Sequence, residues 1–180
     1  MTRTEQRLAE VAGGAVSTSY GVVTAEVPRE RWASAVTSVR DDAELDGRFF
    51  DLLTVVDEFP GGFDVVVRLW SVVTRTAVHL RTSCPREDPV VPSLVAVFAG
   101  ARWHERQAAE MFGVAFDGHP DPLPLLLPEG GVVHPLRKEH VLEQRDAPWP
   151  GAADPAYGGE GGRPPRRPLR PPGASSGAGA

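Results

Sequence analysis

The sequence predicts an α+β protein in two layers: a mostly antiparallel sheet in the order β-α-β-β-β, followed by C-terminal helices and an extended proline-rich strap. Three observations support this fold class. In the first half of the chain, apolar residues recur about every 3.6 residues in some segments, as in helices, and every 2 residues in others, as in strands. Segments between residues 48 and 83 are rich in β-branched and aromatic residues, as strands are. Five prolines between residues 120 and 135 then exclude a helix there.

The first elements are two helices with a strand between them. TEQRLAEVA (4–12) predicts a short helix, and YGVVTAEV (20–27) predicts a strand that ends at Pro28. The next segment, RERWASAVTSVRDD (29–42), places its apolar residues at helical spacing. We therefore expect a second helix that packs one apolar stripe against the sheet.

Three strands follow in close succession. They are RFFDLLTVVDEF (48–59), FDVVVRLWSVV (63–73) and RTAVHLRTS (75–83). Pro-Gly-Gly at 60–62 supplies the first turn, and Thr-Arg at 74–75 lies near the second. Short turns between consecutive strands predict an antiparallel meander.

Two helical segments are predicted after the meander. Ser93 is an expected N-cap for LVAVFAG (94–100), which Gly100 interrupts. ARWHERQAAEMF (101–112) is the longer segment, and Gly113 stands where a left-handed glycine would end it.

The longer helix distributes its charges unusually, because both of its sides carry an acid together with a large apolar group. This pattern favours a helix held between its own domain and another surface, with its charges paired across the contact. Arg106 and Glu110 lie four residues apart and can meet. An ordinary exposed ion pair on a domain helix is the alternative.

The strap is the segment from 114 to 145. Its prolines remove backbone donors and require an extended, turning chain. It also contains the leucines Leu123, Leu125, Leu126 and Leu127, which must rest on the domain or on a partner.

The histidines of the strap do not have the spacing of a metal site. His119, His134 and His140 are 15 and 6 residues apart, whereas structural zinc sites use short paired spacings. We therefore expect no bound metal. A proton-handling His119 beside Asp121 is chemically possible, which leaves a small metal- or histidine-dependent enzyme as one alternative. No nucleophile, phosphate-binding or dinucleotide motif accompanies it.

Composition divides the chain into three parts. Residues 1–19 are expected to form an N-terminal helix and linker, and residues 20–145 the domain with its strap. The remaining 146–180 segment contains eight Gly and eight Pro with few large apolar residues, so it is expected to be a disordered tail.

Charge and cysteine content narrow the function classes further. The net charge is −5, and an acidic protein lacks the basic face that nucleic-acid binding requires. A single cysteine cannot form an internal disulfide. The sequence also lacks a segment apolar enough to span a bilayer and a secretory signal, so we expect a cytoplasmic protein.

The segment ARWHERQAAEMFGVAFDGHPD (101–121), followed by HPLRKEH (134–140), resembles a known family. It is similar to the 30-kDa subunit, also called the C subunit, of the proton-pumping NADH:quinone oxidoreductase, respiratory complex I. The matching residues, which we take as interface and signature positions, are Trp103, Glu105, Arg106, Glu110, Met111, Phe112, Gly113, Phe116, Gly118, His119, Pro120, Asp121, Pro135, Leu136, Arg137 and Lys138. The expected domain between about 15 and 145 agrees with the fold of this family.

The sequence departs from the family pattern at several positions. Gln107 replaces a glutamate, and Leu123 and Pro124 replace two loop arginines. Val133 replaces a glycine, and the Glu-His-Val segment at 139–141 replaces an acidic-aromatic-proline ending. The lost arginines remove charge-assisted bonds, each worth about 1.5–3 kcal/mol where a partner is present.

The resemblance implies a structural role. A member of this family has no catalytic residue and no cofactor of its own, whereas the complex uses NADH, FMN, Fe-S clusters and a quinone, for which we expect menaquinone. The implied place is the peripheral arm on the cytoplasmic side of the cell membrane, so the chain would meet the membrane only through the complex.

The resemblance also implies partners, which are the D, B and I subunits of complex I. The chain would pack on the quinone-site D subunit, near the B and I subunits, with the strap lying across the first of these. On this interpretation His119 and Asp121 orient the strap, and Arg137 and Lys138 contribute cations to an acidic patch. The equivalent subunit of an energy-converting hydrogenase and a free-standing protein-interaction module are the alternatives.

Overall fold

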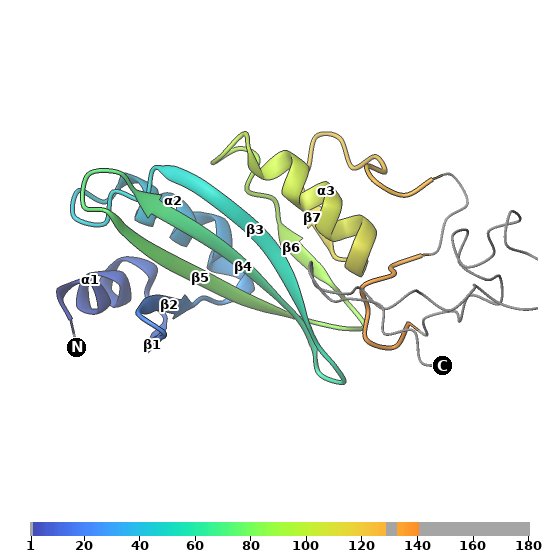
Figure 1. Cartoon of the computed structure of the whole chain (residues 1–180), viewed down its shortest axis with the longest axis horizontal. Coiled ribbons are helices and arrows are strands. Elements are labelled where there is room, and N and C mark those ends of the chain that lie inside the picture. The colour runs from blue at the N-terminus through green and yellow to red at the C-terminus, as the bar shows by residue number, and fades with distance from the viewer. Residues whose placement is uncertain (1, 129–132, 141–180) are drawn as a thin grey trace, which may run out of the picture. The chain divides into compact units, whose positions relative to one another are not determined.

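The computed structural model of the chain describes residues 2–128 and 133–140. Figure 1 shows its helices and strands. In chain order they are α1 (Arg3–Ala12), β1 (Ala15–Ser19), β2 (Val22–Glu26), the short 3-10 helix η1 (Arg29–Arg31), α2 (Trp32–Asp41), β3 (Phe49–Glu58), β4 (Gly62–Ser71), β5 (Thr76–Pro85), β6 (Val90–Pro92), α3 (Ala101–Phe112) and β7 (Ala115–Asp117).

Five of the strands form one sheet in the order β1-β2-β5-β4-β3. β3, β4 and β5 are the predicted antiparallel meander, and β1 pairs antiparallel with β2. Only the junction of β2 with β5 is parallel in this sheet as described. β6 and β7 form a separate parallel pair. The predicted α+β class with a mostly antiparallel sheet is therefore confirmed.

The hydrophobic core lies between this sheet and the helices. Along β4 every second side chain from Phe63 to Ser71 is buried, which is the period of a strand with one covered face. The stripe predicted on α2 is buried against it, and Trp32 is among the largest fully buried side chains. α1 packs on α2 and on the β1–β2 hairpin, with Leu8 fully buried.

The predicted strand at 20–27 is in fact the second half of a hairpin. Tyr20 and Gly21 form its turn with φ of 49° and 77°, and Ala15–Ser19 forms the first strand. Two consecutive residues with positive φ suit the right-handed twist of a two-residue hairpin. The sequence prediction missed β1 because its serines and threonine gave no apolar alternation.

The helix predicted at 94–100 is also corrected, so α3 is the single helix between residues 94 and 117. Residues 94–100 form successive turns, in which Val97 and Phe98 both donate to the carbonyl of Leu94. The Ser93 hydroxyl accepts from the amide of Val95 at 3.2 Å, so it caps a turn. The side chain of Leu94 is fully buried, so residues 94–100 are held to the core as turns and not as a regular helix.

The bounds of β3, β4 and β5 and the glycine that ends α3 agree closely with the predictions, whereas β6 and β7 were not predicted. Gly113 has φ of 73°, and its amide donates to the carbonyl of Ala109. The predicted tail at 146–180 lies outside the described residues, so its disorder stays a prediction. Within 2–128 and 133–140, no helix is long and apolar enough to cross a membrane.

Candidate functional site

The signature residues gather on α3 and on the strap that folds around it. α3 runs beside β3, the outer strand of the sheet (Figure 1). His104 lies over the open edge of that strand, with its Nδ1 3.1 Å from the carbonyl oxygen of Leu53. Its ring meets Phe50 edge-on at 5.3 Å. The helix thereby covers an edge that would otherwise be open to pairing.

Glu105 faces into the domain. Its carboxylate is fully buried and accepts from the Ser93 hydroxyl and the Leu94 amide, each at 2.6 Å. Burial raises the pKa of Glu105 above its ordinary 4.5, against the effect of these two hydrogen bonds. Glu105 therefore ties α3 to the turns at 94–100, inside its own domain.

Arg106 and Glu110 hold the strap against the outer side of α3. The Arg106 guanidinium donates to the carbonyls of Leu123 and Pro124 at 2.8 and 2.7 Å. The Glu110 carboxylate accepts from the three consecutive amides of 125–127 at 3.3, 2.7 and 2.9 Å. The helix thus donates to one part of the strap and accepts from the next, which fixes the strap's register. The predicted contact of Arg106 with Glu110 is replaced by these bonds.

His119 and Asp121 fix the beginning of the strap. The Asp121 amide donates to Nδ1 of His119 at 3.0 Å, so this nitrogen is an acceptor. The other ring nitrogen, Nε2, lies 3.2 Å from the carbonyl of Arg102 and is in place to donate to it. Asp121 accepts from Arg102 at 2.7 Å, which lowers the pKa of its carboxyl group. Both residues thus connect the beginning of the strap to Arg102 of α3, and their role in orienting the strap on a partner stays a prediction.

The second half of the strap closes the C-terminal end of α3. The last carbonyls of a helix have no partner within the helix. Here His134 binds the carbonyl of Glu110 at 3.0 Å, and the amide of Leu136 donates to Met111 at 3.2 Å. The Arg137 guanidinium donates to the carbonyl of Phe112 at 2.7 Å. Residues 134–137 therefore cap the helix.

A buried carboxylate joins this cap to the sheet. Asp57 of β3 is 4% exposed, pairs with Arg86 and accepts from the amide of Lys138 at 2.8 Å. Arg86 also binds Glu139 at 2.8 Å and stacks on Phe63 at 4.6 Å. Asp57 and Arg86 were not predicted. Asp57 did carry a signal, because it follows Leu53 and Val55 on the buried side of a strand.

The remaining signature positions shape the chain or face solvent. Gly118 has φ of 80°, and Phe112 packs edge-on against Phe63 at 6.5 Å. Pro120 and Pro135 stiffen the strap on either side. Trp103 is 59% exposed and lies under Arg106, whose guanidinium is 5.3 Å from its ring.

Two leucines of the strap point away from the domain. Leu123 and Leu126 are 62% and 60% exposed, whereas Leu125 and Leu127 are half-buried. The carbonyl of Leu123 and the amide of Leu126 are held by α3, so their side chains stand on a fixed backbone. Together with the exposed Trp103, these two leucines are here called the strap ridge.

The described residues hold no cluster of three or more potential metal ligands. Cys84 is buried, and its thiol donates to the carbonyl of Phe63 at 3.6 Å. Burial raises the pKa of Cys84 to about 11, which disfavours the reactive thiolate.

The fold and the site define a class of protein: an α+β domain whose signature polar residues are used to shape a strap. The family described as respiratory-chain NADH dehydrogenase, 30 kDa subunit, matches residues 25–146. The chain belongs to this family, as the motifs of α3 and the strap predicted.

Relatives of known name agree with this membership. The NADH-quinone oxidoreductase C subunit of Acidithiobacillus ferrooxidans is 35% identical over 151 residues, which are 76% of this chain and 73% of the relative. The C subunit of Roseiflexus sp. is 37% identical over 68% of this chain and 71% of the relative. The C/D subunit of Sulfurihydrogenibium sp. is 36% identical over 71% of this chain, which spans only 22% of that longer protein.

Two solved structures share the fold. A trypsin-resistant fragment of Nqo5 matches with a TM-score of 0.59 and 25% identity, over 67% of this chain and 99% of the fragment. A chain of the membrane-bound sulfane sulfur reductase, an archaeal respiratory membrane complex, has a TM-score of 0.61 and covers 76% of this chain and 83% of its own. At 23% identity the second shows the fold alone.

Proposed function

We propose that this chain is a non-catalytic structural subunit in the peripheral arm of a proton-translocating NADH:quinone oxidoreductase. It lies on the cytoplasmic side of the cell membrane and meets the membrane only through the complex. Its strap ridge docks on the quinone-site D subunit, near the B and I subunits. Electrons pass from NADH through FMN and Fe-S clusters to a quinone, for which we propose menaquinone, and all of these are bound by other chains.

The observation that carries the proposal is the way the signature residues are used. Arg106 and Glu110 of α3 bind the backbone of the strap, His119 of the strap binds the carbonyl of Arg102 in α3, and the three side chains do not form a catalytic constellation with one another. Residues 119–127 are thereby held in one conformation before they meet a partner, so less conformational entropy is lost on docking. Leu123 and Leu126 are then the groups left to enter a partner surface.

The names of two relatives support the D subunit as the neighbour. The proteins of Sulfurihydrogenibium sp. and Methylococcus capsulatus are both called C/D, and this chain spans 22% and 23% of their lengths. Two subunits that can be joined in one polypeptide are good candidates for contact when they are separate chains. The extra length of these proteins is consistent with a second subunit in the same chain.

The structure changes the role proposed for Arg137. Its guanidinium binds the carbonyl of Phe112 and stacks over Phe63 at 5.2 Å, so it serves the α3 cap. The backbone amide of Lys138 donates a hydrogen bond to the carboxylate of Asp57, and Lys138 is exposed. Of the two cations, Lys138 is therefore the one proposed to reach an acidic patch.

The test is the double variant Leu123→Ser/Leu126→Ser in the organism that carries the complex. Burying each leucine contributes about 1.5–3 kcal/mol, so docking should weaken by about 100-fold or more. We expect the isolated domain to keep its circular dichroism spectrum, while assembled complex and NADH-driven quinone reduction fall together.

Val56→Ser is the matched control, because Val56 is also exposed but lies on the face of β3 opposite to Asp57, which binds the strap. Normal assembly of the double variant would refute docking through the strap ridge. Purification of the unaltered chain as a monomer without iron–sulfur proteins would favour a free-standing module.

A further inference from the structure

A second apolar surface lies at the end of the sheet that is farthest from the α3 cap. Tyr20 is 103% exposed at the tip of the β1–β2 hairpin, and Val73 is 81% exposed in the β4–β5 turn. Val72 in the same turn and Phe49 at the start of β3 are also exposed. We call these four residues the turn-end patch. None of them belongs to the strap or to the signature.

The strand register brings these residues together. β2 and β5 are parallel neighbours with Val23 opposite Val78, and these residues lie three positions after Tyr20 and Arg75. The two turns therefore lie at the same end of the sheet. Phe49 pairs with Trp70 at the same end of β4. The patch thus follows one border of the sheet.

The two hairpin turns of the turn-end patch are well separated from the α3 cap. Phe63, over which Arg137 of the cap stacks, lies near the start of β4, and Val72 follows the end of that strand. Val72 is nine positions after Phe63, which corresponds to about 30 Å along an extended strand.

The conformation of Tyr20 indicates that its exposure has a use. Its φ of 49° lies in the left-handed region, where an asparagine or glycine is strongly preferred in a hairpin turn. A tyrosine in this place gains no burial in its own domain. Fully exposed tyrosines at loop tips are efficient anchors in protein interfaces, because a large rigid ring is ordered at low entropic cost.

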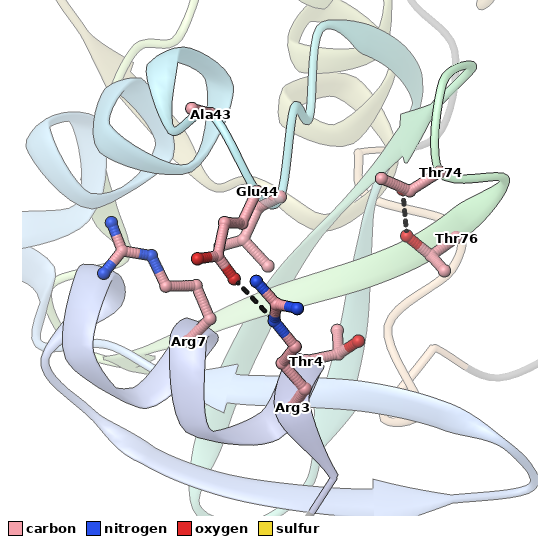
Figure 2. A pocket seen from close by; sticks show the side chains of 8 residues that line it. Arg3, Thr4, Arg7, Ala43, Glu44, Thr74 and Thr76 are labelled. Atoms are coloured by element: carbon pink, nitrogen blue, oxygen red, sulfur yellow. Dashed lines mark hydrogen bonds and ion pairs between the residues drawn. The ribbon is translucent and has the colours of Figure 1, made fainter.

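Charge defines the chemistry of the partner. Arg3, Arg7 and Arg48 at this end pair with Glu44, Asp42 and Asp46. Arg75, beside Val73, is exposed, and within 2–128 and 133–140 no carboxylate pairs with it. A hollow of about 340 Å³ lies next to the same turn, between α1, residues 43–45 and Thr74 (Figure 2). The surface therefore offers an aromatic anchor, an exposed cation and an adjacent recess.

We propose that the turn-end patch is a second interface, which binds a protein chain that offers an apolar pocket for Tyr20 and a carboxylate for Arg75. A second copy of this chain fits less well, because a two-fold contact would place the two Arg75 side chains near each other. An anionic membrane surface is disfavoured by Glu44, Asp46 and Asp51 at the same end. The inference rests on the proposed function only in taking the partner to be another subunit of the same complex.

Photo-crosslinking in the intact complex tests the proposal. Tyr20 and Val73 are replaced singly by p-benzoylphenylalanine, and Thr54 on the exposed side of β3 is the control position. We expect irradiation at positions 20 and 73 to join this chain to another subunit, at a yield at least tenfold above that at 54. Equal yields at all three positions, products with lipid, or products with a second copy of this chain would each overturn it.

A charge variant gives an independent measurement. Arg75→Glu should release at least tenfold more of this chain from the complex in a mild salt wash, whereas Arg75→Lys should retain the wild-type level. Equal retention of both variants would overturn the assignment of Arg75. A crosslinker placed at Leu126 reports separately on the strap. If the chain co-purifies with the complex but gives no crosslinked product from position 126, the proposed docking of the strap is wrong. If position 126 gives a product and position 20 does not, only the second interface is wrong.

Discussion

At the scale of single residues, the two acids of α3 have opposite roles although they are five positions apart. Glu105 is buried and holds the helix to the turns that precede it. Glu110 is only partly buried and accepts three amides of the strap. The sequence placed an acid on each side of the helix, and the structure gives each acid its own set of backbone donors. A helix held on two sides was therefore predictable, but the donors were not.

Gly113 combines two constraints that can be separated by experiment. Its φ of 73° disfavours any side chain, and a Cβ would lie 2.5 Å from both Arg137 Nη2 and His134 Nε2. Gly21 has nearly the same φ, 77°, but a Cβ there would have no atom within 4 Å. Gly21→Ala should thus lower the free energy of unfolding only through the strain of a positive φ, by about 1 kcal/mol. Gly113→Ala should cost clearly more, measured by urea unfolding. Equal costs would show that residues 134–137 do not press on this glycine.

At the scale of elements, α3 and the strap form one unit. The strap supplies the partners that the C-terminal carbonyls of α3 lack, and the helix supplies charged side chains to a proline-rich segment that cannot form regular structure. Each therefore depends on the other for its conformation. This mutual dependence explains why the motif is continuous from Trp103 to Asp121 and resumes at Pro135.

Glu110→Gln is the sharpest test of this unit. The neutral amide is a weaker acceptor, and one of its two terminal atoms is a donor that faces backbone amides. We expect hydrogen exchange of the amides at 125–127 to accelerate by about tenfold or more, corresponding to about 1.5 kcal/mol of local stability. Amides in β4 should be unaffected. Glu87→Gln, at another acid outside the strap contacts, is the control, and unchanged exchange at 125–127 would contradict the proposed clamp.

The pH dependence of the same amides follows from the pKa of Glu110. Partial burial is the largest influence and raises this pKa, but the bonds from Leu127, Leu126 and Leu125 together bring it below the ordinary 4.5. A carboxyl group whose pKa is lower in the folded state stabilises that state above the unfolded pKa. Protection at 125–127 should therefore be full at neutral pH and decline as the pH falls below about 4.5. In Glu110→Gln this decline should be absent.

The elements that the sequence predicted well are those with a strong apolar period. β3, β4, β5, α2 and α3 each bury one regular face, so their spacing alone located them. β1 was missed because Ala15–Ser19 is short and largely exposed. Residues 94–100 looked helical, but the burial of Leu94 and the bonds to Glu105 depend on contacts distant in sequence. The strap contacts of Arg106 are long-range as well, and no local pattern specifies them.

At the scale of the whole molecule, the described residues carry two apolar surfaces at separate places, joined by a rigid sheet. The strap ridge is shaped by the signature, whereas the turn-end patch lies in two hairpin turns that the signature does not include. If both surfaces dock as proposed, the chain holds two neighbours at a fixed distance.

The stability of the domain should depend on residues 133–140 and not on those that follow. A chain ending at Val141 keeps the α3 cap and the bond from Lys138 to Asp57, whereas a chain ending at Pro128 loses both. The shorter chain leaves three helix carbonyls without these partners and removes one donor from a buried carboxylate. At about 0.5–1.5 kcal/mol for each hydrogen bond, the free energy of unfolding of the shorter chain should be lower by about 3 kcal/mol.

Urea unfolding followed by circular dichroism should show equal midpoints for the full chain and the chain ending at Val141. A lower midpoint for the latter would mean that residues beyond 141 stabilise the domain, and the strap could then not be treated as complete at the α3 cap.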